Sequence, residues 1–434
     1  MEIFDELLHD ISIPKFVKVR YEIKQPHLEN PGAALRDAIA QRNILENIKP
    51  GDSVCIACGS REIANLAEIV RALVQEIKKH GGDPFIIPAM GSHGGATAEG
   101  QKEILINFGL DEGNVGAPIR ATMETVYVGQ SASNLEVRLD KYASEADWII
   151  PVGRIKPHTA FHGPIESGVQ KMITIGMGKQ HGADICHSKG FGQMSKNVHE
   201  FAHTILSKYS NINAIGIIEN AYHETYKIIA FPHDTIEGEE PGFLEEARSL
   251  MPKIPFNKVD AIFIDELGKN ISGTGADPNI IGRSPVMGKW EPHADAIVMF
   301  DLTDESHGNV TGIGNADVTT MRVYNKFDMK ATYPNNITSR VPKAANIPPV
   351  MPNDRLAMKF GLKICFNADV SLGPKVVWLH NTLMMHQFLI SESLLPEAEK
   401  VSNLVILSEP QVVHVYYLHN LNLLMKMETL RKDF

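Results

Sequence analysis

A strand–helix–strand pattern near the start of the chain constrains its fold most. Residues 52–58 form an apolar run of strand length, residues 63–79 place apolar side chains at helical spacing, and residues 84–88 form a second apolar run. Two strands joined by one helix of this length are parallel, because the helix returns the chain to the same end of the sheet. The pattern therefore predicts an α/β fold with a parallel sheet.

The length of the chain and its later strand-sized runs predict a second domain. A chain of 434 residues is longer than one ordinary hydrophobic core accommodates. A fresh series of apolar runs begins after residues 252–257. We expect two α/β domains with mainly parallel sheets and a cleft between them. Residues 1–256 would form the catalytic and cofactor-binding domain, and residues 257–434 would close the cleft.

Composition excludes several classes of protein. The net charge of −10 argues against a general nucleic-acid-binding protein, because phosphate contacts need clustered Lys and Arg. No apolar run approaches the roughly 18 residues that a membrane-spanning helix needs. Four cysteines do not make a disulfide framework, and the first residues do not resemble a signal peptide. We expect a cytoplasmic protein with a small-molecule partner; the sequence does not indicate its oligomeric state.

Polar loops follow the predicted strands. Ser60 and Arg61 come after the first strand, and a glycine-rich loop with His93 comes after the second. Another apolar run leads into residues 151–190, which are rich in His, Lys and Gly and include His158. Because the carboxyl ends of parallel strands share one edge of a sheet, we expect Arg61, His93 and His158 to face a common crevice.

The segment from Gly176 to Gly182 resembles a phosphate cradle, because glycine backbone and a lysine can hold an anion. It matches neither of the usual nucleotide-binding spacings, and a tightly packed turn is an equal alternative. Three histidines at the crevice could instead hold zinc, with Glu166 as the base of a zinc-dependent hydrolase or lyase. Other histidines are expected to be ordinary surface or core residues: His27, His80, His199, His203, His233, His380, His386, His414 and His419.

Four short motifs follow one another along the first half of the chain. They are Ser60-Arg-Glu62, Gly91-Ser-His-Gly-Gly-Ala-Thr97, Lys156-Pro-His158, and Ser167-Gly-Val-Gln-Lys171 with His187 sixteen residues further on. In this order they resemble the T-R-P, G-x-H-x-x-x-T, second-histidine and S-G-G-R-K motifs of the nickel-dependent lactate racemase family. Enzymes of this family use a nickel-pincer nucleotide.

The resemblance implies a racemase or epimerase of a 2-hydroxy acid. Its cofactor would be pyridinium-3,5-bisthiocarboxylic acid mononucleotide nickel, and cofactor maturation proteins would be partners. The resemblance implies that His187 is the nickel ligand, that Lys171 lies beside the cofactor, and that His93 and His158 are the acid/base pair. Arg61 would bind the substrate carboxylate or hydroxyl.

Departures from the family pattern bear on the substrate. Gln170 replaces the family arginine, and the interval from His158 to Lys171 is longer than in the lactate enzymes. Lys269 is the best match for a substrate-binding lysine in the second domain. We therefore expect a larger or more polar 2-hydroxy acid than lactate; a non-catalytic sensor of a hydroxy acid or nucleotide is a further alternative. The residues expected to bind the cofactor are Lys171, Ser60, Gly176, Gly178, Lys179 and His181.

Overall fold

The structure is a computed structural model in which two compact units are distinguished by their contacts. Unit 1 combines Met1–Lys24 with Pro252–Phe434, and unit 2 is the continuous segment Gln25–Met251. Each unit is described by itself. His414 and His419 lie outside the described residues, which are 2–23, 25–286, 288–365 and 373–413.

Unit 2 is built on a five-stranded sheet in the order β3-β2-β6-β7-β8. The first four strands in this order are parallel, and β8 is antiparallel to β7. The parallel pairing follows the predicted strand–helix–strand pattern. The strands are β2 (Ser53–Cys58), β3 (Asp83–Pro88), β6 (Trp148–Arg154), β7 (Ala214–Glu219) and β8 (Thr225–Phe231), and a separate hairpin joins β4 (Thr125–Gln130) to β5 (Glu136–Asp140).

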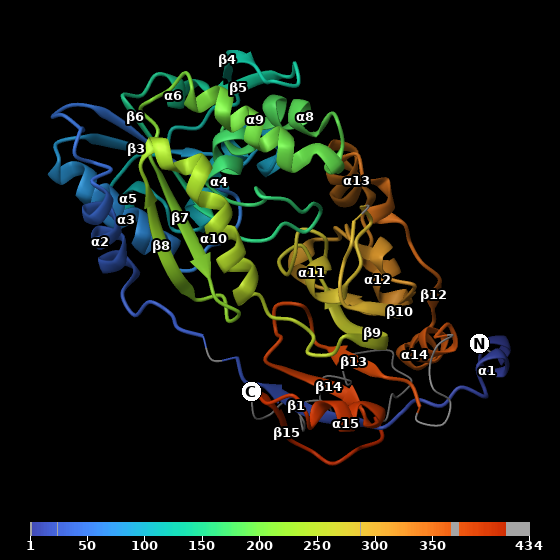
Figure 1. Cartoon of the computed structure of the whole chain (residues 1–434). Helices are drawn as coiled ribbons and strands as arrows, with labels where there is room; N and C mark the ends of the chain where they lie inside the picture. Colours follow the sequence, from blue (N-terminus) through green and yellow to red (C-terminus); the bar gives the residue numbers. More distant parts are fainter. Residues whose placement is uncertain (1, 24, 287, 366–372, 414–434) are drawn as a thin grey trace. The chain divides into compact units, whose positions relative to one another are not determined.

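Both faces of this sheet are buried, as is usual for parallel strands. Successive residues of β2 belong to opposite apolar clusters, with Cys55 and Ala57 in one and Val54 and Ile56 in the other. The first cluster includes side chains of α9 and α10, and the second includes side chains of α2 and α3. The helices of unit 2 are α2 (Pro31–Arg42), α3 (Leu66–Lys79), α4 (Ala98–Asn107), α5 (Glu112–Val115), α6 (Lys141–Ser144), α7 (Val169–Lys171), α8 (Lys179–His187), α9 (Met194–Leu206) and α10 (Ile236–Leu250), with a π-helical turn over Met172–Gly176 (Figure 1).

Unit 1 contains an eight-stranded sheet in the order β12-β11-β10-β9-β13-β14-β1-β15. The run from β12 to β13 is parallel, whereas β14 and β1 are paired antiparallel to their neighbours. The predicted α/β class with mainly parallel sheets is therefore confirmed. The strands are β1 (Phe16–Tyr21), β9 (Lys258–Leu267), β10 (His293–Leu302), β11 (Val318–Thr320), β12 (Val350–Met351), β13 (Val376–Leu379), β14 (Gln387–Ser391) and β15 (Leu404–Ile406).

The position of β1 departs from the domain boundary expected from the sequence. Residues 1–256 were expected to form one domain, but β1 forms hydrogen bonds between β14 and β15 in the sheet of unit 1. The first 24 residues therefore belong with the C-terminal part of the chain. The expected cleft between the domains stays a proposal. The helices of unit 1 are α1 (Glu2–Leu7), α11 (Pro278–Ile281), α12 (Met321–Lys326), α13 (Met329–Ser339), α14 (Asp354–Lys363) and α15 (Leu395–Ala398).

Among the residues that the structure describes, none of the helices combines the length and the hydropathy needed to cross a membrane.

Candidate active site

The predicted polar loops meet at one edge of the unit 2 sheet. Because β3, β2 and β6 are adjacent and parallel, the residues after each strand leave the same edge. Ser60 and Arg61 follow β2, His93 follows β3, and His158 follows β6. The sheet therefore places these residues at one edge, as the predicted strand order requires.

Ser60 and His93 bring the first two loops together. The hydroxyl Oγ of Ser60 is hydrogen-bonded to Nδ1 of His93. The His93 loop is fixed from behind by the buried Gln101, whose Nε2 donates to the carbonyls of Gly91 at 2.9 Å and His93 at 3.1 Å. Gly94 has φ 62°, and a Cβ there would lie 2.7 Å from the backbone nitrogen of Gln101. Only glycine allows this close approach without a clash.

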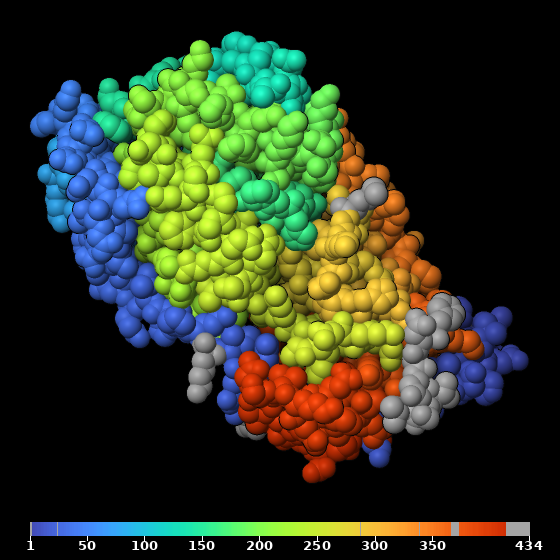
Figure 2. Space-filling model, in the orientation of Figure 1, coloured from blue at the N-terminus to red at the C-terminus, as the bar shows by residue number. Residues whose placement is uncertain are grey.

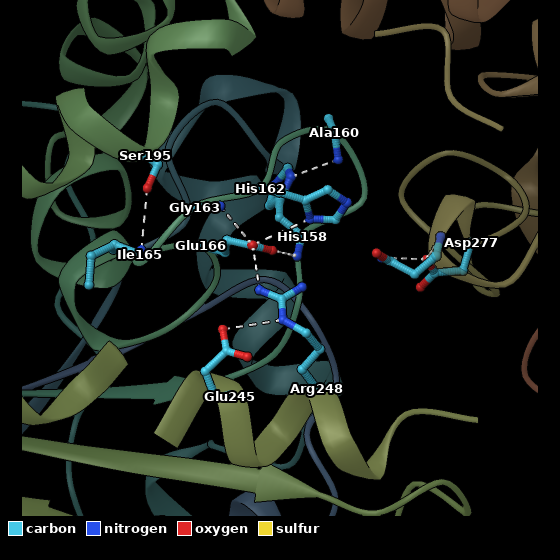
Figure 3. Close-up of polar contacts among 11 residues, drawn as sticks. His158, Ala160, His162, Gly163, Ile165, Glu166, Ser195, Glu245, Arg248 and Asp277 are labelled. Carbon is cyan, nitrogen blue, oxygen red and sulfur yellow. Dashed lines mark hydrogen bonds and ion pairs between the residues drawn. The ribbon is translucent and has the colours of Figure 1, made fainter. Parts of the chain in front are cut away.

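Glu166 organises the loop that carries His158. Its buried carboxylate accepts hydrogen bonds from the backbone N–H of His158 at 2.6 Å, the N–H of Gly163 at 3.0 Å and Nη2 of Arg248 at 2.9 Å (Figure 3). Nδ1 of His162 lies 3.3 Å from the same carboxylate. Burial raises the pKa of Glu166, but the hydrogen bonds from His162 and Arg248 outweigh it and hold the pKa below its usual value. A carboxylate stabilised in this way supports the loop, and it does not suit the role of general base in a zinc enzyme.

The tautomer of His158 is set by a backbone donor. The N–H of Ala160 donates to Nδ1 of His158 at 3.0 Å, so the neutral ring carries its proton on Nε2. Burial, followed by the positive charges of Lys171 and His187, lowers the pKa of His158 well below its ordinary value. The imidazole is therefore neutral near pH 7.

His158, Lys171 and His187 gather around two phenylalanine rings. The ring centroid of His158 lies 4.3 Å from that of Phe161 and 6.4 Å from that of Phe191. His187 meets Phe191 edge-on at 5.6 Å, and Nζ of Lys171 lies 5.9 Å from the centre of the Phe161 ring. These three predicted site residues are thus close neighbours in unit 2.

The environment of Lys171 suits a nucleophile, and that of His187 suits a metal ligand. Burial, followed by the charge of Arg61, lowers the pKa of the Lys171 amine to about 8. Such an amine is partly uncharged near neutral pH and can act as a nucleophile. Nδ1 of His187 lies 2.6 Å from the carbonyl oxygen of Ala183, so it must carry the proton and leave the lone pair on Nε2. Histidines that bind metals commonly donate their second N–H to a backbone carbonyl in this way.

Comparison with known protein families gives one match, over the N-terminal part of the chain. The model of the lactate racemase N-terminal domain matches residues 8–198, which include Ser60, Arg61, His93, His158, Lys171 and His187. Residues 8–198 therefore resemble a lactate racemase N-terminal domain. None of the curated proteins that were compared matches the sequence.

A solved structure of the lactate racemase family shares the fold. The lactate racemase apoprotein from Thermoanaerobacterium thermosaccharolyticum superposes with a TM-score of 0.53 at 13% sequence identity. The match covers 85% of this chain and 98% of that chain. At this identity the likeness establishes the fold alone. The match to the lactate racemase N-terminal domain suggests a racemase-type, and hence isomerase, function.

The glycine segment at residues 176–182 does not form the expected phosphate cradle. Lys179 is fully buried, with Nζ 2.9 Å from Oδ2 of Asp140 and hydrogen-bonded to the carbonyl of Pro88. Its charge is therefore engaged inside the protein. Added Cβ atoms at Gly176 and Gly178 would lie 2.8 Å and 2.4 Å from backbone oxygens. The alternative of a tightly packed turn fits this geometry better than a cofactor-binding role for these three residues.

Two further predicted residues, His181 and Lys269, belong to other parts of the chain. His181 is exposed on α8. Lys269 belongs to unit 1, where Nζ donates to the carbonyl of Gly273 at 2.6 Å and to Oδ1 of Asn335 at 2.8 Å. A substrate-binding role for Lys269 stays a proposal.

A short motif on α9 was overlooked at the sequence level. Residues 199–203 read His-Glu-Phe-Ala-His, which is an H-E-x-x-H motif. His199 and His203 were expected to be ordinary histidines, but the four-residue spacing on a helix places them on one face. That spacing was the signal that could have found them. In the described part of the chain, no group of three or more His, Cys, Asp or Glu side chains could hold a metal ion, so the three-histidine zinc site of the hydrolase alternative is not formed there.

Proposed function

We propose that this protein belongs to the lactate racemase family and racemises or epimerises a 2-hydroxy acid with the help of a nickel-pincer nucleotide. The observation that carries the proposal is the convergence of His158, Lys171 and His187 around Phe161 and Phe191. The family resemblance assigns these three residues to proton transfer, cofactor contact and nickel binding. The close grouping supports that assignment.

The residues of the cluster fit the implied cofactor. His187 would hold the nickel through Nε2, because Nδ1 is committed to the carbonyl of Ala183. An imidazole and sulfur donors suit nickel. The Lys171 amine, with its pKa of about 8, would lie beside the nucleotide. When bound, the cofactor supplies a reversible acceptor for the hydrogen on the α-carbon of the substrate.

His93 and His158 would move the hydroxyl proton of the substrate, one for each configuration. Racemisation requires that each group both takes the proton and returns it, which suits imidazoles near pH 7. Arg61 would bind the substrate carboxylate through its guanidinium group. The buried Glu166 would hold the His158 loop in place during turnover.

The two histidines differ in how they can exchange protons. The hydroxyl of Ser60 can donate to Nδ1 of His93 or accept from it, so both tautomers of His93 are supported. The N–H of Ala160 can only donate to His158, so this ring must lose that hydrogen bond before Nδ1 carries a proton. We infer that His93 is the more readily reversible base of the pair.

The function can be tested with protein produced alongside the cofactor maturation enzymes. Incubating one enantiomer of each 2-hydroxy acid in a panel should lead to loss of optical rotation and to deuterium exchange at the α-carbon. His187→Ala should lose nickel and activity. His93→Ala and His158→Ala should keep nickel but lose about 10²- to 10⁴-fold in turnover, the usual contribution of acid/base catalysis.

The matched control is His80→Ala, since His80 is exposed at the end of α3 and far along the chain from the cluster. It should retain both nickel and activity. Full nickel content and turnover in the His187→Ala protein would contradict the assigned ligand. Tight binding of a hydroxy acid with no change in its configuration would instead indicate a sensor.

A further inference from the structure

The segment between β2 and α3, residues 59–65, carries two of the proposed site residues and is attached to neighbouring elements at two points. Near its start, Oγ of Ser60 is hydrogen-bonded to Nδ1 of His93 in the loop after β3. Near its end, Ala64 is hydrogen-bonded to the hairpin of β7 and β8. Arg61, the proposed ligand of the substrate carboxylate, lies between these attachments. The contacts that fix Ala64 therefore bear on where Arg61 is presented.

Both backbone groups of Ala64 are bound by two facing residues of the hairpin. The N–H of Ala64 donates to Oε1 of Glu219 at 2.9 Å, and the hydroxyl of the buried Thr225 donates to the Ala64 carbonyl at 3.1 Å. Glu219 and Thr225 are partners in the β7–β8 ladder. Opposite residues of an antiparallel pair lie on the same face of the sheet. These two residues, which we call the Ala64 clamp, therefore hold one residue of the neighbouring segment from both sides.

The same threonine stabilises an unusual backbone conformation next to Ala64. Asn65 has φ 59°, in the left-handed region that asparagine tolerates better than most residues. Its Nδ2 donates to Oγ1 of Thr225 at 3.0 Å, and α3 begins at the next residue. A backbone conformation of this kind persists where the surrounding contacts hold it. The hairpin therefore sets the path by which the segment enters α3.

The carboxylate of Glu219 also binds an arginine at the edge of the sheet. Nη1 of Arg154, the last residue of β6, donates to Oε2 of Glu219 at 2.6 Å, and the Glu219 side chain is only 7% exposed. Burial raises the pKa of Glu219, but the charge of Arg154, followed by hydrogen bonds from His223 and from the backbone, outweighs it and lowers this pKa to about 2. Glu219 is therefore negatively charged at neutral pH.

Arg154 lies beside the segment that carries Arg61. β2 and β6 are neighbouring parallel strands in which Cys58 is paired with Val152, so both strands end at the same edge of the sheet. Two guanidinium groups at one edge repel each other. By pairing with Arg154, Glu219 lowers the positive charge that Arg61 meets there. The carboxylate thus favours the position of Arg61 electrostatically, in addition to holding Ala64.

The hairpin that provides the clamp is packed into unit 2. Ile228 and Ala230 of β8 belong to the same apolar cluster as Leu35 and Ile39 of α2. α2 also contacts α3, the helix that follows the Arg61 segment. In Figure 2, the blue surface of α2 borders a yellow-green surface formed by the region of β8 and α10. The Ala64 clamp is therefore fixed to the packed core rather than to a surface turn.

We propose that Glu219 is a positioning residue, which together with Thr225 holds residues 59–65 in the form that presents Arg61 to the substrate carboxylate. Both residues act through Ala64 and Arg154 rather than on the reacting atoms. The inference rests on the proposed function, because that function assigns Arg61 to the carboxylate of a 2-hydroxy acid. Since the carboxylate is bound equally before and during the reaction, loss of the clamp raises KM more than it lowers kcat.

Hydrogen–deuterium exchange on full-length, cofactor-free protein tests the clamp apart from activity. Glu219→Ala removes the acceptor of the Ala64 N–H, so a peptide spanning residues 59–66 should exchange roughly tenfold faster or more, the effect of losing a hydrogen bond to a charged group. Thr225→Val should also speed this exchange, and it tests the clamp independently where Glu219→Ala does not fold. Thr225→Ser keeps the hydroxyl and should exchange like wild type. Unchanged exchange in both Glu219→Ala and Thr225→Val would overturn the proposal.

Glu224→Gln is the matched control. Glu224 lies in the same hairpin, its side chain is 46% exposed, and Oε2 accepts from Nδ2 of Asn220 within the turn. Its replacement should leave both the exchange of residues 59–66 and the kinetics as in wild type. Exchange that rises as much in Glu224→Gln as in Glu219→Ala would show general loosening of the hairpin and would contradict a specific clamp.

Steady-state kinetics complete the test, with the 2-hydroxy acid that cofactor-loaded wild-type protein racemises in the panel. Glu219→Ala should raise KM about tenfold and leave kcat within about twofold of wild type. A fall in kcat at unchanged KM would overturn the positioning role. If wild-type protein racemises none of the acids, the proposed function fails, whereas faster exchange in Glu219→Ala would still support the clamp and unchanged exchange would still refute it.

Discussion

The hydroxyl of Ser60 gives the first prediction at the scale of single residues. Ser60→Ala removes the partner of Nδ1 of His93 and should slow turnover about fivefold, the usual effect of losing one hydrogen bond worth about 1 kcal/mol. Ser60→Thr keeps the hydroxyl and should retain activity. Steady-state kinetics should show a lower kcat with little change in KM, because His93 would act on the bound substrate. Equal activity in the alanine and threonine variants would contradict this role.

Lys171 gives a second residue-scale prediction, on stability. Its pKa is about 8 in the folded protein and about 10.5 in the unfolded chain. The unfolded state therefore binds more protons between these values, so the folded protein gains stability as pH rises through this window. Lys171→Met should unfold at a higher temperature than wild type at pH 7. That advantage should shrink from pH 8 upward and vanish near pH 10.5 in thermal melts of cofactor-free protein. A constant difference in melting temperature across this range would show that the charge of Lys171 does not destabilise the folded protein.

At the scale of elements, the contact between α10 and the loop after β6 can be tested through Arg248. Arg248→Met leaves the buried carboxylate of Glu166 without its positively charged partner, which is strongly destabilising at buried sites. Thermal unfolding should shift to lower temperature, and racemisation should fall because His158 loses its fixed loop. Glu245→Gln is the control, since its 3.4 Å pair with Arg248 is mostly exposed and should contribute little. Equal melting temperatures in the two variants would contradict the loop-anchoring role.

The elements also show what the sequence could and could not predict. Helical spacing over residues 63–79 predicted α3, and the strand order placed Arg61, His93 and His158 at one edge. These follow from local patterns. The burial of Lys179 does not, because its partner Asp140 lies on a distant hairpin whose position depends on tertiary packing.

At the scale of the whole molecule, the boundary predicted near residue 256 lies close to the division at Pro252, but the N-terminal end was misplaced. Residues 16–21 carry too little pattern to show which sheet they join, since any short apolar strand can pair with either sheet.

The division into two units predicts that fragments of the chain differ in stability. Residues 25–251 are continuous and contain both apolar clusters of their sheet, so this fragment should fold alone and unfold cooperatively by circular dichroism.

Residues 252–434 expressed alone should be far less stable, because β1 forms backbone hydrogen bonds between β14 and β15. Its absence leaves β15 without the neighbour that joins it to the sheet and exposes apolar side chains such as Val17 and Val19, which are fully buried in the chain. A peptide of residues 1–24 added to this fragment should restore a sharper and higher thermal transition. A peptide with Val17→Asp and Val19→Asp should fail to do so. If the fragment melts identically with and without the native peptide, β1 contributes only a peripheral strand and the unit is defined by residues 252–434 alone.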